Sequence, residues 1–94
     1  MDKAIQKEIY ADVLERLIIH LRNRTDVQNI DLMNLSGFCR NCLSKWYVNA
    51  AEKKNIKVDY EEARELIYGM SYAEWKDKYQ IEASKEQLEK LKEK

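Results

Sequence analysis

Two cysteines separated by two residues are the part of this sequence with the clearest chemical potential. Cys39 and Cys42 occur in residues 37–47, which read GFCRNCLSKWY. On a helix, residues three apart lie on the same face, so both thiols would point in one direction. Paired cysteines bind soft metals, exchange electrons as a dithiol and disulfide, or pack in a core as small apolar groups.

A metal site built on this pair needs further ligands, and His20 is the single histidine of the sequence. Structural zinc takes four ligands, usually Cys and His. Cys39, Cys42 and His20 would therefore bind zinc or iron with a fourth ligand from Asp26, Asp31, water or a second subunit. A site of this kind with an open position would resemble a catalytic zinc site, although the second ligand pair typical of zinc motifs is missing.

Thiol redox chemistry is the weakest of the three hypotheses. With Ser36 as the N-cap of the next helix, Cys39 would be its third residue, where backbone N–H groups and the helix dipole lower the pKa of a thiol. Redox motifs with this spacing normally follow a β-strand, however, and the sequence predicts none. We therefore expect Cys39 and Cys42 to lie in the core or a subunit interface, because free cysteine is among the most buried residue types.

Hydrophobic spacing predicts an all-α chain that folds as a single helical domain over residues 1–94. A long N-terminal helix is predicted over residues 2–24, and we expect it to pack antiparallel to the cysteine-bearing helix. His20 would lie at the margin of its buried face. The apolar residues expected on that face are Ile5, Ile9, Val13, Leu14, Leu17, Ile18 and Leu21.

The central, cysteine-bearing helix is predicted over residues 38–54, after a joint at Ser36-Gly37 with Ser36 as N-cap. One continuous helix over residues 30–53 is the alternative. Its buried face would carry Cys39, Cys42 and Trp46. The solvated side would carry Arg40, Asn41, Ser44, Lys45 and Asn49. Polar residues gather around the joint, either as turn formers or as a polar pocket beside the thiols: Asn29, Asp31, Asn34 and Asn41.

Two or three short C-terminal helices complete the predicted bundle, over residues 60–68, 72–80 and 85–92. Each follows an N-cap residue with Glu or Gln three positions later, which is the pattern of a capping box. The pairs are Asp59 and Glu62, Ser71 and Glu74, and Ser84 and Gln87. Gly69 would end the first of these helices. The aromatic residues expected to join the layers are Trp46, Trp75, Tyr68 and Tyr72.

Composition limits the partners that we expect. The 94 residues include 17 basic and 17 acidic side chains, and the net charge of zero argues against nucleic acid as a partner. The sequence lacks the run of about 20 apolar residues that a membrane span needs. With no secretory signal beside the two cysteines, we expect a reducing cytoplasm. An aromatic-rich chain of this length is expected to hide an apolar face in a homodimer; no other protein partner is indicated.

Two blocks of the sequence resemble a known family. Residues 25–47, TDVQNIDLMNLSGFCRNCLSKWY, and residues 68–76, YGMSYAEWK, are similar to a family of short bacterial proteins called domain of unknown function 1244. The resemblance implies an all-helical fold and a bacterial, cytoplasmic origin, and it implies no catalytic residue. Our leading hypothesis is a small, non-enzymatic, homodimeric helical module of unknown function, with zinc or iron binding by Cys39, Cys42 and His20 as the alternative.

Overall fold

The computed structural model describes residues 1–93, and within them the chain forms six helices and no strand. They are α1 (Lys3–Asn23), α2 (Asn29–Ser36), α3 (Arg40–Glu52), α4 (Tyr60–Tyr68), α5 (Tyr72–Tyr79) and α6 (Lys85–Lys92). The all-α prediction is confirmed, and the last three helices match their expected bounds to within one residue. None of the helices in this part of the chain is long and apolar enough to span a membrane.

Local capping signals explain why the C-terminal helices begin where they do. Ser84 forms a complete capping box with Gln87, since each side chain bonds the backbone N–H of the other residue. Ser71 accepts a hydrogen bond from the backbone of Glu74 at 3.1 Å. Asp59 is the N-cap of α4, but its side chain makes no capping bond.

The predicted joint between the second and third helices exists, but its residues have other roles than expected. Ser36 is the last residue of α2, where its hydroxyl donates to the carbonyl of Leu32, so the prediction that it caps the cysteine helix is wrong. Gly37 ends α2 in the left-handed conformation with φ +82°, which glycine adopts at little cost. Cys39 is the extended N-cap of α3. The alternative of one continuous helix is therefore wrong as well.

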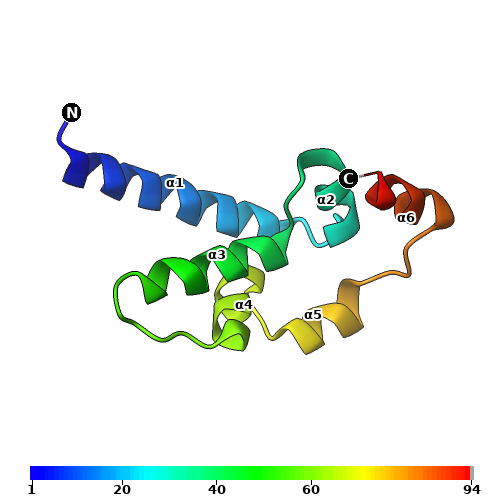
Figure 1. Cartoon of the computed structure of the whole chain (residues 1–94). Helices are drawn as coiled ribbons and strands as arrows, with labels where there is room; N and C mark the ends of the chain where they lie inside the picture. The colour runs from blue at the N-terminus through cyan, green and yellow to red at the C-terminus, as the bar shows by residue number, and fades with distance from the viewer. Residues whose placement is uncertain (94) are drawn as a thin grey trace.

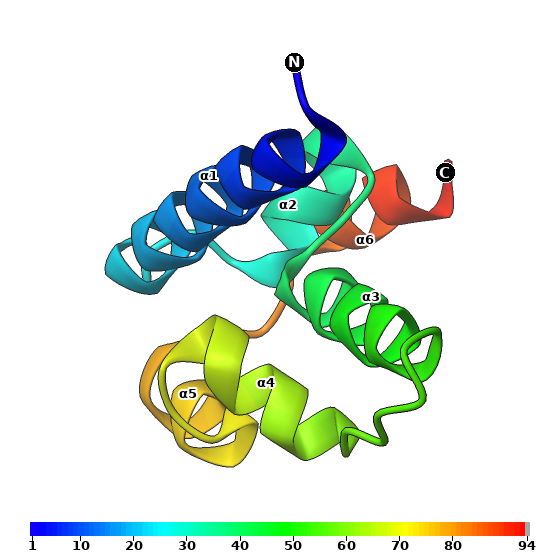
Figure 2. The ribbon, with the colours of Figure 1, turned by 90° about the vertical axis from the view of Figure 1, so that its left-hand side faces the viewer.

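Helix α4 is the element against which α1, α3 and α5 pack, while α2 pairs with α6 (Figures 1 and 2). We expected α1 to pack antiparallel to α3, and this prediction is wrong because α4 occupies that position against α3. The buried core consists of Leu21, Leu43, Ile67, Tyr68 and Trp75.

Aromatic residues hold α4 and α5 together. Trp75 is only 1% exposed, and its ring meets the ring of Tyr68 edge-to-face with centroids 5.2 Å apart. Tyr72 packs against Tyr68 in the same way at 5.5 Å. Trp46, in contrast, is 55% exposed, and its nearest aromatic partner is Phe38, with ring centroids 5.9 Å apart. The prediction that Trp46 joins the layers is therefore wrong.

Helix α1 projects from the rest of the molecule (Figure 1). Every residue from 1 to 17 is exposed, and Leu21 is the single buried residue of α1. The last turns attach the helix, with Ile18 and Leu21 against the core and Arg22 donating to the carbonyl of Leu66. The predicted burial of the whole apolar face of α1 is therefore wrong within one chain, because only the C-terminal end of the helix reaches α4.

We predict that Gly69→Ala destabilises the fold more than Gly37→Ala does. Both glycines have a positive φ, near +80°, so an alanine at either position costs about 1–2 kcal/mol. A Cβ at Gly69 would also lie 2.9 Å from Cδ of Arg22, whereas a Cβ at Gly37 meets no described atom within 4 Å. Displacing Arg22 from Leu66 adds about 1 kcal/mol. Urea unfolding measures both variants, and equal losses would contradict this assignment.

Candidate functional site

The two thiols lie together at the start of α3. The sulfur atoms of Cys39 and Cys42 are 3.9 Å apart, and both thiols are free. Cys39 is 7% exposed and Cys42 is half-buried. The prediction that Cys39 is the third residue of the helix is wrong because it is the N-cap, and Cys42 takes that third position.

Burial controls the acidity of the Cys39 thiol. Removal from water raises its pKa above the ordinary value, and this effect outweighs the opposing hydrogen bonds from the backbone of Cys42 and Asn41. Cys39 is therefore a neutral thiol near pH 7. A redox nucleophile needs the opposite shift, because the thiolate is the reactive form.

His20 does not join the thiols within one chain. It is exposed on α1, and residues 1–93 contain no group of three or more His, Cys, Asp or Glu residues that could hold a metal ion. The two candidate acidic ligands have other partners. Asp26 forms an exposed ion pair with Arg24 at 2.9 Å, and Asp31 accepts a bond from the side chain of Gln87 at 2.8 Å.

Met33 provides a third sulfur atom beside the thiols, which the sequence analysis missed. Its Sδ lies 3.9 Å from Sγ of Cys42. Met33 belongs to the last turn of α2, and its backbone carbonyl accepts the N–H of Gly37. Spacing along the sequence gives no signal for this contact, because it depends on the turn that Gly37 makes between the two helices.

Arg40 is the most unexpected residue of this region. Its predicted place on the solvated side of α3 is wrong, since it is 1% exposed. The guanidinium donates to the backbone carbonyls of Arg24 and Val27 at 2.8 Å each, and more weakly to that of Leu21 at 3.4 Å. It also lies over the ring of Trp75, with Cζ 4.9 Å from the ring centroid. Among the described residues, no carboxylate forms a hydrogen bond with the guanidinium of Arg40. Carbonyl oxygens at the end of α1 therefore offset its charge.

A chain of hydrogen bonds continues from Arg40 into α4. The amide oxygen of Asn29 accepts from the Arg40 guanidinium at 3.1 Å, and its amide nitrogen donates to the hydroxyl of Tyr68 at 2.9 Å. Tyr68 then donates to Asn41 at 2.7 Å. Burial raises the pKa of Tyr68 above its ordinary value, so this hydroxyl stays protonated. These asparagines therefore connect three helices, rather than forming turns.

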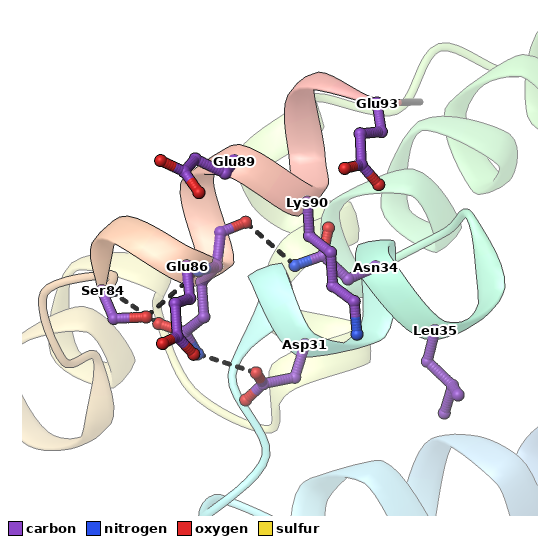
Figure 3. Close-up of a pocket in the computed structure, with 9 residues that line it drawn as sticks. Asp31, Asn34, Leu35, Ser84, Glu86, Glu89, Lys90 and Glu93 are labelled. Atoms are coloured by element: carbon purple, nitrogen blue, oxygen red, sulfur yellow. Dashed lines mark hydrogen bonds between the residues drawn. The ribbon is translucent and has the colours of Figure 1, made fainter.

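A separate groove of about 520 Å³ lies between α2 and α6 (Figure 3). Asn34 donates to the carbonyl of Gln87 at 3.1 Å, while its own amide oxygen is buried with no hydrogen-bond partner in residues 1–93. Charged residues of α6 line the other wall. Leu35 points away from α6 and is 86% exposed (Figure 3). The groove therefore lies apart from the cysteines, and polar contacts such as that of Asn34 with Gln87 join the two helices that line it.

The sequence pattern of one family, described as protein of unknown function (DUF1244), matches residues 27–93. The chain belongs to this family. The DUF1244 segment includes Met33, Cys39, Arg40 and Cys42, whereas His20 lies before it, on α1. No curated protein matches the sequence. The two comparisons therefore give a family but no biochemical activity.

We predict that Arg40→Met destabilises the DUF1244 segment by about 3 kcal/mol or more, because buried carbonyl oxygens lose a charged donor. Arg40→Lys should recover only part of this loss, since an ammonium cannot reproduce the planar fork of the guanidinium. Chemical unfolding measures both. Arg24→Met is the control and should cost much less, because Arg24 is exposed. Arg40→Met as stable as wild type would contradict this role.

We also predict slow alkylation of Cys39 at neutral pH. Its raised pKa lowers the fraction of reactive thiolate, and its burial limits access. In Cys42→Ser, iodoacetamide should label Cys39 at least about 10-fold more slowly than the unfolded chain. Cys39→Ser, which leaves the more exposed Cys42, should react faster. Mass spectrometry follows both variants, and rapid labelling of Cys39 below pH 8 would instead support thiol redox chemistry.

Proposed function

We propose that the chain is the subunit of a homodimer, a non-enzymatic helical module of one domain in which α1 carries most of the interface. The exposed apolar stripe of α1 is the observation that supports this proposal. The side chains of the α1 stripe are each between 36% and 64% exposed, and they are Ile5, Ile9, Tyr10, Val13, Leu14 and Leu17.

The surface area of the chain fits this proposal. The chain exposes 7309 Å², whereas a compact monomer of this mass exposes about 5,700 Å². Its radius of gyration is 15.0 Å, against about 12 Å for a compact domain of this length. The excess surface is about 1,600 Å² per chain, or about 3,200 Å² for two chains, which lies within the total area that obligate homodimers bury.

A second copy also suits the chemistry of α1. An isolated helix of about 15 residues is marginally stable in water, so the projecting part of α1 needs a surface to cover it. Residues 3–17 carry three basic and three acidic side chains, so two copies would not repel each other. Exposed Leu35 and Trp46 offer further apolar area for a symmetric contact.

The buried polar groups support a structural role for the rest of the module. Arg40 and Gln28 hold backbone groups of other segments, and Ser44 bonds the carbonyl of Arg40. The free thiols fit a reducing cytoplasm. The alternative proposal is a zinc or iron site formed by His20, Cys39 and Cys42. It requires a dimer that brings His20 of one copy to the thiols of the other.

Val13→Glu tests the proposed dimer, because it places a charge in the middle of the α1 stripe. We expect wild type to sediment as a dimer at micromolar concentration and Val13→Glu to sediment as a monomer, with at least about 100-fold weaker association. Ile19→Glu is the matched control, since Ile19 is also exposed but lies about 120° from Val13 around the helix. Circular dichroism checks that each variant folds. A monomeric wild type would overturn the proposal.

A further inference from the structure

Three sulfur atoms from two helices converge where α2 ends and α3 begins. The Sγ of Cys42 is in the middle, 3.9 Å from Sγ of Cys39 and 3.9 Å from Sδ of Met33. Cys39 is buried, while Cys42 and Met33 are half-buried, so an ion could reach the cluster from solvent. The left-handed turn at Gly37 brings the last turn of α2 against the first turn of α3.

The spacing of the sulfurs suits ligands that share one ion. A metal–sulfur bond of about 2.3 Å places two ligating sulfurs about 3.8 Å apart in tetrahedral geometry and about 4.0 Å apart in trigonal geometry. Both observed distances fall between these values. The Cys39–Cys42 pair and the Cys42–Met33 pair are therefore each spaced as two sulfur ligands of one ion are.

The types of ligand select the metal. Thiolate and thioether sulfurs are soft ligands that favour copper(I), whereas a structural zinc ion prefers four Cys or His ligands. Residues 1–93 bring no third His, Cys, Asp or Glu to the two thiols. The set of two cysteines and one methionine therefore fits a soft monovalent ion, which accepts low coordination numbers, better than zinc.

We propose that Cys39, Cys42 and Met33 form a binding site for a soft monovalent metal ion of the copper(I) class, with one ion per chain. Both thiols release their protons to solvent as the ion binds, which leaves the complex with one net negative charge. The start of α3 favours that charge, because the backbone of Cys42 and Asn41 acts to lower the pKa of the Cys39 thiol, against the larger effect of burial. The Arg40 guanidinium also interacts electrostatically with Cys39.

Competition with a copper(I)-binding dye tests the site. Reduced protein is titrated with copper(I) and bicinchoninate under anaerobic conditions, and we expect one ion per chain. Met33→Leu keeps the volume of the side chain and should weaken binding by at least about 10-fold, whereas Cys42→Ser should weaken it by about 100-fold or more. The controls are Met70→Leu, His20→Ala and the monomeric Val13→Glu, which should each bind as wild type does.

Several results would overturn the proposal. Wild type that fails to take copper(I) from the dye would exclude the site. Unchanged binding by Met33→Leu would remove the thioether from it, and one ion per two chains would indicate four thiols shared by a dimer. Loss of binding in His20→Ala would favour the His20 site instead. Circular dichroism of Cys42→Ser separates loss of a ligand from loss of the fold.

Discussion

A buried guanidinium, to which no carboxylate of residues 1–93 bonds, is the constraint on which the rest of this structure depends. An unpaired buried charge is costly, so Arg40 can be accommodated only where several acceptors converge on it. The end of α1 supplies backbone carbonyls, Asn29 supplies an amide oxygen, and Trp75 supplies the face of its ring. Arg40 therefore ties together α1, the segment before α2, α3 and α5.

The position of Arg40 fixes the rotation of α3 about its own axis. Arg40, Leu43 and Ser44 face the core, and residues of the opposite face are consequently more exposed. Cys42 then lies half-buried beside Met33, and Trp46 lies largely in solvent. The sulfur cluster and part of the apolar surface thus follow from the same interaction that completes the core.

Helix boundaries were predictable because they depend on neighbours in the sequence. Ser84, Ser71 and Gly69 each act within one turn, and each acts as the sequence predicts. Which face of a helix is buried depends on distant residues instead. The charge of Arg40 predicts that its side chain faces solvent. It is buried instead because the carbonyls at the end of α1 accept hydrogen bonds from it. Likewise, the pairing of Met33 with Cys42 depends on the turn at Gly37, so only the two-cysteine part of the candidate site could be found from the sequence.

The apolar spacing of α1 also predicts a local feature, a buried face, without identifying the distant partner that covers it. A period of nearly four residues indicates that a face is buried, but it does not say which chain covers it. Within one chain only the end of α1 reaches the core, and the rest of the stripe remains exposed. Burial of this stripe by a second copy would satisfy the pattern without changing the fold. Because α1 precedes the family segment of residues 27–93, most of the dimer contact and the three sulfur ligands would then lie in separate parts of the chain.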